Sequence, residues 1–140
     1  FEKLKRNTAD CKGVRVRNVA ITSTNGSISF FSHPESSMSS SLVQRVSGQK
    51  SITVQAKTLD TLMKEEEINS IDLLKFDIEG AEYDAFKDFQ GLRNVKRLIG
   101  EVHPDLMLAS SDEFLKLFDG FSVVCTPLSG GRFIISAVRK

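Results

Sequence analysis

One segment, Ile71–Tyr83 with the sequence IDLLKFDIEGAEY, constrains the fold of this 140-residue chain more than any other. Apolar residues run almost without a break as far as Ile78, which predicts a strand buried on both faces of a mainly parallel sheet. Gly80 permits a tight turn, and apolar residues then continue at helical spacing to Phe89. The segment therefore predicts a strand, a turn and a helix.

Acidic residues appear where this strand ends. Asp77 and Glu79 flank Ile78, and a second apolar run, VKRLIGEV at 95–102, ends in Glu101 and is followed by His103. Residues two apart in an extended chain point to the same side, so Glu101 and His103 should face together. Ligands of open α/β sheets bind at the carboxyl ends of the strands, so these four side chains are candidates for chemistry.

The remaining pattern predicts a single α/β domain over residues 1–140. Residues 32–51 are rich in serine and predict a long loop. Residues 14–21 and 28–31 predict strands joined as a hairpin by Asn25 and Gly26. A helix at 1–7, a strand at 52–57 and a terminal antiparallel hairpin of 121–125 with 132–138 are also expected. Two further helices are expected, one capped by Thr58 with Asp60 in its first turn, where it favours the helix dipole, and one that begins at a capping box of Ser110 and Glu113. Alternating strands and helices predict three layers around one sheet.

Composition excludes several classes of function. The 19 Lys and Arg nearly balance the 18 Asp and Glu, so we expect neither nucleic acid nor an anionic membrane surface as partner. Cys11 and Cys125 lack metal-ligand or disulfide-framework spacing, which favours a reducing, cytoplasmic location. No apolar run is long enough to span a bilayer, and no signal peptide is recognisable.

Three motifs resemble the FkbM family of S-adenosylmethionine-dependent methyltransferases. They are TLDTL at 58–62, IDLLKFDIEGAEYDAF at 71–86 and IGEVHP at 99–104. FEKLKRN at 1–7 also resembles the stretch that follows the second strand in this family. The resemblance implies a Rossmann-like class I methyltransferase fold and methyl transfer from S-adenosylmethionine to a hydroxyl of a sugar, another saccharide or a natural product.

The chain departs from the family in one respect. The family holds the cofactor with a glycine-rich turn after the first strand and an acid after the second, and no GxGxxG or GxGxG occurs here. We therefore expect the C-terminal portion of a methyltransferase domain, lacking the first two strands and binding cofactor weakly or not at all. Sheet edges left open in this way would be available to a second copy of the chain.

Roles for the four polar residues follow from the expected reaction. Methyl transfer requires an aligned acceptor oxygen and removal of its proton. Asp77, beside the expected position of the cofactor's reactive methyl group, is the first candidate to position or deprotonate the acceptor, and His103 is the other candidate base. Glu79 and Glu101 would orient these groups, or Asp77, Glu101 and His103 would hold a divalent cation, which we rank below direct acid–base catalysis.

Structural alternatives exist for each residue. Asp77 and Glu79 are alternatively caps of the next helix, His103 a turn histidine, and Glu82 a partner of the helix dipole. The whole chain is alternatively a non-catalytic interaction or scaffold module derived from a methyltransferase. Purely structural positions are expected for Lys75, Tyr83 and Phe86.

Overall fold

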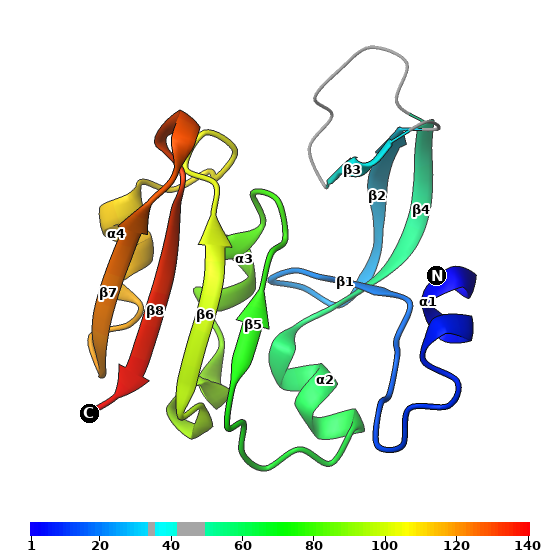
Figure 1. Ribbon diagram of the computed structural model, residues 1–140, viewed down its shortest axis with the longest axis horizontal. Helices are drawn as coiled ribbons and strands as arrows, with labels where there is room; N and C mark the ends of the chain where they lie inside the picture. Colours follow the sequence, from blue (N-terminus) through cyan, green and yellow to red (C-terminus); the bar gives the residue numbers. More distant parts are fainter. Residues whose placement is uncertain (34–35, 42–49) are drawn as a thin grey trace.

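The computed structural model describes residues 1–33, 36–41 and 50–140, and these residues form a mixed α/β structure (Figure 1). The first of its two sheets has the strand order β1 (Val19–Ile21), β4 (Lys50–Lys57), β2 (Gly26–His33) and β3 (Ser36–Ser41). The second has the order β5 (Leu74–Phe76), β6 (Arg97–Val102), β8 (Phe133–Arg139) and β7 (Phe121–Pro127). The α-helices are α1 (Glu2–Asn7), α2 (Leu59–Glu65), α3 (Glu82–Phe86) and α4 (Ser111–Lys116), with short 3-10 helices at Gln90–Asn94 and Ser129–Gly131.

The prediction of one mainly parallel sheet is wrong for the described strands. Only β1 with β4 and β5 with β6 pair in parallel, whereas β2–β4, β2–β3, β6–β8 and β7–β8 are antiparallel. The α/β class itself and the C-terminal antiparallel hairpin, formed by β7 and β8, are confirmed.

The predicted hairpin between 14–21 and 28–31 is also wrong. β1 pairs with β4 in parallel, and β2 pairs with β4 from its other side. Asn25 explains the difference, because its side-chain oxygen accepts a hydrogen bond from the backbone N–H of Thr58 at 3.1 Å. The Asn25 turn is thus tied to the end of β4, and β4 occupies the place between β1 and β2.

The serine-rich segment 32–51 is not one loop. β2 extends to His33, β3 covers Ser36–Ser41 and β4 begins at Lys50, while residues 34–35 and 42–49 lie outside the described part of the chain. β3 forms by backbone pairing with β2, in which Phe31 opposes Ser41 and His33 opposes Ser36. Such pairing needs no alternation of apolar residues, so the sequence pattern gave no sign of it.

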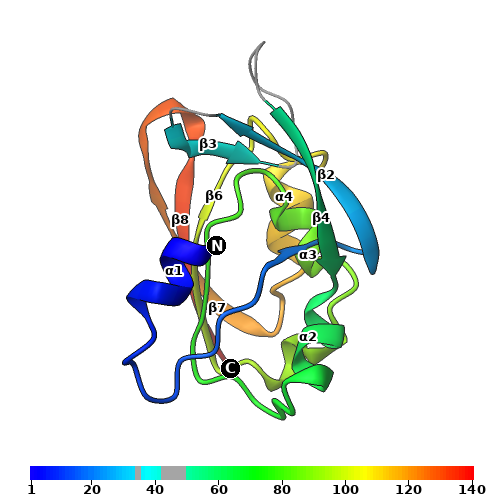
Figure 2. The ribbon, with the colours of Figure 1, turned by 90° about the vertical axis from the view of Figure 1, so that its right-hand side faces the viewer.

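Helices α3 and α4 cover one face of the β5–β6–β8–β7 sheet (Figures 1 and 2). On β6, Leu98 and Val102 are buried towards this face, whereas Ile99 on the opposite face is 38% exposed. The core on the covered side contains edge-to-face phenylalanine rings. These are Phe76, Phe86, Phe114 and Phe118.

The opposite face of this sheet remains open in the described residues. Val124 is 63% exposed and Val138 is 53% exposed, and the sheet therefore has one helical layer rather than the expected two. For the same reason β5 is not buried on both faces: Phe76 points into the core, whereas the neighbouring Lys75 is exposed. No helix in the described part of the chain combines the length and apolar character that crossing a membrane requires.

Helix ends follow the sequence closely. Thr58 caps α2, accepting a hydrogen bond from the N–H of Thr61, as predicted. Ser110 and Glu113 form the predicted capping box at the start of α4. Asp60 does more than favour the helix dipole, because its carboxylate accepts hydrogen bonds from the N–H groups of Gln90 and Gly91 at 2.9 and 2.7 Å. Asp60 thereby links α2 to the segment that leads into β6.

Gly100 tests the packing beneath the end of β5. A Cβ at position 100 would lie 2.4 Å from ring atoms of the buried Phe76. We expect Gly100→Ala to lower the free energy of unfolding by about 1–3 kcal/mol, because the ring must shift within a packed core. Chemical denaturation measures the change, with the exposed Ser122→Ala as control, and a Gly100→Ala variant as stable as the control would contradict this packing.

Glu113 tests the capping box through its pKa. The Ser110 hydroxyl, and next the Ser110 backbone N–H, donate to the Glu113 carboxylate and hold its pKa below the usual value. Because the pKa of Glu113 is lower in the folded than in the unfolded protein, its ionised carboxylate stabilises the fold. This stabilisation is fully present above the unfolded-state pKa and is lost as the pH falls through the folded-state pKa. We expect Ser110→Ala to raise the pKa of Glu113 in an NMR titration and Ser111→Ala to leave it unchanged. A pKa indifferent to Ser110→Ala would refute the role of the cap.

Candidate active site at the ends of β5 and β6

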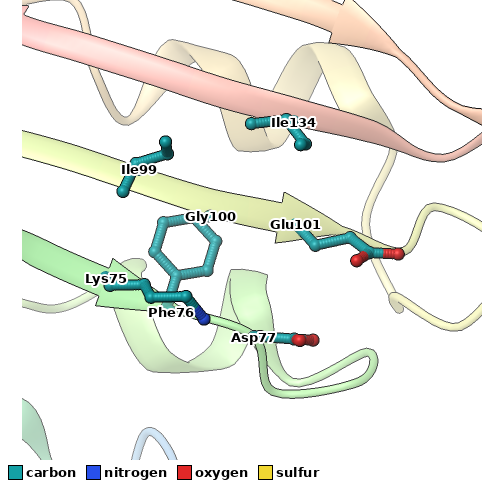
Figure 3. Close-up of a pocket in the computed structure, with 7 residues that line it drawn as sticks. All are labelled: Lys75, Phe76, Asp77, Ile99, Gly100, Glu101 and Ile134. Atoms are coloured by element: carbon teal, nitrogen blue, oxygen red, sulfur yellow. The ribbon is translucent and has the colours of Figure 1, made fainter.

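Two carboxylates stand side by side at the carboxyl ends of β5 and β6. The parallel register places Phe76 beside Gly100, so the next residues along, Asp77 and Glu101, are neighbours. Figure 3 shows both carboxylates projecting beyond the strand ends towards the same side. Asp77 is exposed and Glu101 is partly buried. Two negative charges this close repel each other.

The turn after β5 brings in a third acid. Glu79 has a φ of 53° and Gly80 a φ of 102°, both in the left-handed region. This conformation costs a non-glycine residue such as Glu79 about 1–2 kcal/mol. A Cβ on Gly80 would lie 2.5 Å from the Cβ of Leu106, so the turn packs directly on the segment after β6. As a result, Glu79 Oε2 lies 3.7 Å from His103 Nε2.

A buried pair of side chains holds the centre of the site. His103 is 1% exposed and Glu82 is fully buried, and His103 Nδ1 lies 2.8 Å from Glu82 Oε1. Glu82 Oε1 also accepts a hydrogen bond from the N–H of Gly80 at 3.1 Å. Oε1 is therefore an acceptor whether Glu82 is ionised or carries a proton on its other oxygen. Because an ionised carboxylate only accepts hydrogen bonds, His103 Nδ1 is the donor to an ionised Glu82.

The other ring nitrogen of His103 faces acids. Nε2 lies 3.4 Å from Glu101 Oε1 and 3.7 Å from Glu79 Oε2. The backbone fixes the ring's position, since the carbonyl of His103 accepts hydrogen bonds from the N–H groups of Leu106 and Met107. Asp77, Glu101 and His103 each offer a ligand atom within 4.8 Å of the others, so these three residues are able to hold a metal ion.

All four residues singled out in the sequence thus meet at one place. Neither Asp77 nor Glu79 caps α3, whose N-cap is Ala81 without any side-chain hydrogen bond. The capping alternative is therefore wrong. His103 does lie in a turn, as the structural alternative for this residue predicted. Its buried ring also pairs with Glu82 and faces Glu101.

Glu82 is the residue that sequence reasoning missed. It does lie in the first turn of α3, but its complete burial against His103 makes it more than a dipole partner. A signal was present, because Glu82 falls three, four and seven residues before Ala85, Phe86 and Phe89. A charged residue within the buried stripe of a helix requires a buried partner. The packing positions predicted for Tyr83 and Phe86 are confirmed.

Cavities lie on both sides of β5, and Asp77 lines each of them. One, of about 250 Å³, extends over β5, β6 and β8 (Figure 3) and is lined by Lys75, Phe76, Asp77, Ile99, Gly100, Glu101 and Ile134. The other, of about 420 Å³, extends towards β1, α2 and α3 and is lined by Ile21, Leu59, Leu62, Leu74, Lys75, Phe76, Asp77, Ile78, Ala85 and Phe86. The larger volume lies within the range of small-molecule sites, which runs from about 300 to 1,000 Å³.

Fold and site together define an α/β protein in which acids and a buried histidine gather at the ends of two parallel strands. A family model, the Methyltransferase FkbM domain, matches residues 1–119. Because the match covers most of the 140 residues, the chain belongs to the FkbM methyltransferase family. The match ends before β7 begins. Comparisons with curated proteins and with solved structures found no match.

Because Glu82 is paired in the interior, we expect its replacement to lower the free energy of unfolding much more than replacement of Asp84, the other acid on α3. Glu82→Ala leaves the Nδ1–H of His103 without its partner in the interior, so we expect a loss of about 3–5 kcal/mol in the free energy of unfolding. Asp84→Ala removes a partly exposed ion pair with Lys87, and we expect it to cost about 0–1 kcal/mol. Urea denaturation of both variants measures the contrast. Equal, small losses would show that the Glu82–His103 contact contributes little to stability.

Proposed function

We propose that this chain carries the acceptor-binding edge of an S-adenosylmethionine-dependent methyltransferase that methylates a hydroxyl oxygen of a saccharide or natural product. Membership of the FkbM methyltransferase family supports the reaction class. The observation that carries the proposal is the position of Asp77, at the end of β5 and in the lining of both cavities. A carboxylate so placed can reach a ligand from either side of the strand.

The described residues fit one part of the cofactor. The 420 Å³ cavity has mainly apolar walls, which suit an uncharged portion of a ligand, and Asp77 stands at its border. The sequence contains no glycine-rich turn, so we assign no contacts with the ribose or amino-acid ends of the cofactor to this chain. When bound, S-adenosylmethionine would supply a methyl group attached to a positively charged sulfur. The bond between the methyl carbon and this sulfur would break as the acceptor oxygen forms its bond to the same carbon.

The chain's own residues would orient the acceptor and remove its proton. The Asp77 carboxylate accepts a hydrogen bond from the acceptor hydroxyl, which aims an oxygen lone pair and draws off the proton during transfer. Glu101, its neighbour on β6, lines the smaller cavity together with Asp77. Glu82 is a positioning residue, because it acts by holding the His103 ring against this pair of acids.

A non-catalytic interaction module is the second candidate function. The absence of a glycine-rich turn from the sequence favours it. Calorimetric titration with S-adenosylmethionine and S-adenosylhomocysteine tests the enzyme, since a scaffold has no need to bind either molecule, whereas absence of binding is expected both of a scaffold and of a chain without the glycine-rich turn. Saturable binding that Asp77→Asn weakens would support the enzyme.

Asp77→Asn tests the catalytic assignment directly. The amide keeps the size of the side chain but cannot take up a proton, so we expect turnover to fall by about 100-fold or more. Formation of S-adenosylhomocysteine in the presence of a panel of saccharides and polyols is the measurement. Asp72→Asn is a matched control, because Asp72 precedes β5, is exposed and pairs with Lys96 away from the site. Equal turnover in Asp77→Asn and the wild-type protein would exclude this role for Asp77.

A further inference from the structure

We propose that Asp77, Glu101 and His103 bind a divalent cation of the Mn²⁺ type. The three ligands come from the end of β5, the end of β6 and the residue that follows β6. One oxygen from each carboxylate and one ring nitrogen all lie within 4.8 Å of one another. In a cation site with bonds of about 2.0–2.3 Å, neighbouring ligands are separated by about 2.8–3.3 Å and opposite ligands by about 4.0–4.6 Å. Small side-chain adjustments therefore bring the three atoms to binding distance.

The buried histidine supplies an observation independent of the acids. Its Nδ1 lies 2.8 Å from Glu82 Oε1, which leaves the other ring nitrogen, Nε2, directed towards Glu101 and Glu79. Histidines that bind metals commonly donate their second ring N–H to a carboxylate, which fixes the ring and raises its basicity. Glu82 and His103 have this arrangement, with both side chains almost completely buried.

Glu101 has one basic neighbour among the described residues, and it shares that neighbour with Asp105. Arg132 lies 3.8 Å from Glu101 Oε1 and is shared with Asp105, whose carboxylate is 3.6 Å from the Arg132 Nε. In the part of the chain that the structure describes, no ion pair joins Asp77 to a lysine or arginine. A divalent cation between Asp77 and Glu101 would relieve the repulsion between the two neighbouring carboxylates.

The ligand set favours Mn²⁺ over other common cations. Carboxylate oxygens suit Mg²⁺ and Mn²⁺, whereas the imidazole nitrogen favours a transition metal, and Mn²⁺ satisfies both preferences. Three protein ligands leave further coordination positions open. If the proposed methyl transfer is correct, on which this last step depends, the preferred acceptors have two adjacent oxygens, such as vicinal diols. One oxygen would be anchored by the cation, while the other would give its proton to the second oxygen of the Asp77 carboxylate as it bonds the methyl carbon.

Titration of the chelator-treated protein with Mn²⁺, followed by electron paramagnetic resonance, tests the site without any need for methyl transfer. We expect one saturable Mn²⁺ per chain. Glu101→Gln removes a ligand charge, and we expect it to weaken binding at least tenfold. Glu82→Gln, which alters only the group behind His103, should weaken binding about 10- to 100-fold.

Asp105→Asn is the matched control. Asp105 is an exposed acid near the site that contacts Arg132 and is not one of the three proposed ligands. Its replacement should leave Mn²⁺ affinity within twofold of the wild-type value. Absence of saturable binding, or equal weakening by Asp105→Asn and Glu101→Gln, would overturn the site. Circular dichroism of each variant ensures that affinities are compared between folded proteins.

The two proposals fail in different ways. Saturable Mn²⁺ binding that depends on Glu101 supports the cation site even in a protein that transfers no methyl group, and such a result would refute only the proposed function. Methyl transfer that is unaffected by chelator, in a protein that binds no Mn²⁺, would refute the cation site and leave the methyltransferase assignment intact.

Discussion

The hydrogen bond between Glu82 and His103 is the interaction on which the rest of the site depends. It connects the first turn of α3 to the end of β6 inside the protein, where two polar side chains gain little from solvent. Burial of either side chain alone would be unfavourable, so each stabilises the position of the other. The N–H of Gly80 adds a second bond to the same Glu82 oxygen. The turn after β5, the start of α3 and the end of β6 are thereby fixed as one unit.

The contacts of Glu82 with His103 and Gly80 explain why the turn at Glu79 and Gly80 adopts an unfavourable backbone conformation. Glu79 adopts a left-handed conformation that is unfavourable for a residue with a side chain, and this brings its carboxylate towards His103. The close approach of Gly80 to Leu106 leaves no space for a larger residue at that position. Below the turn, Gly100 admits the ring of Phe76 beneath the strand ends. Two glycines thus allow acids from separate segments to meet.

Much of the fold could be predicted from local patterns. The capping box at Ser110, the cap at Thr58 and the C-terminal hairpin each depend on residues close in sequence, and each is confirmed. The strand pairings of the first sheet could not be predicted, because they depend on contacts such as that of Asn25 with Thr58, 33 residues away. The open face of the second sheet was also unpredictable, since an apolar strand pattern does not reveal which faces are covered.

The site was more predictable than the sheet that carries it. Asp77, Glu79, Glu101 and His103 were recognisable because polar residues stood out at the ends of apolar runs, and parallel pairing of β5 with β6 brings those ends together. Glu82 was missed because an acid in the first turn of a helix has an ordinary explanation in the helix dipole. Its position within the apolar stripe of α3 distinguished Glu82 from an ordinary acid in the first turn of a helix.

The protonation of His103 tests this account most directly. Long-range proton–nitrogen NMR spectra of the metal-free protein near neutral pH report which ring nitrogen carries hydrogen. We expect Nδ1 to carry the hydrogen of its bond to the Glu82 carboxylate. An Nδ1 without a hydrogen would contradict the bond between Glu82 and His103 that holds the site together.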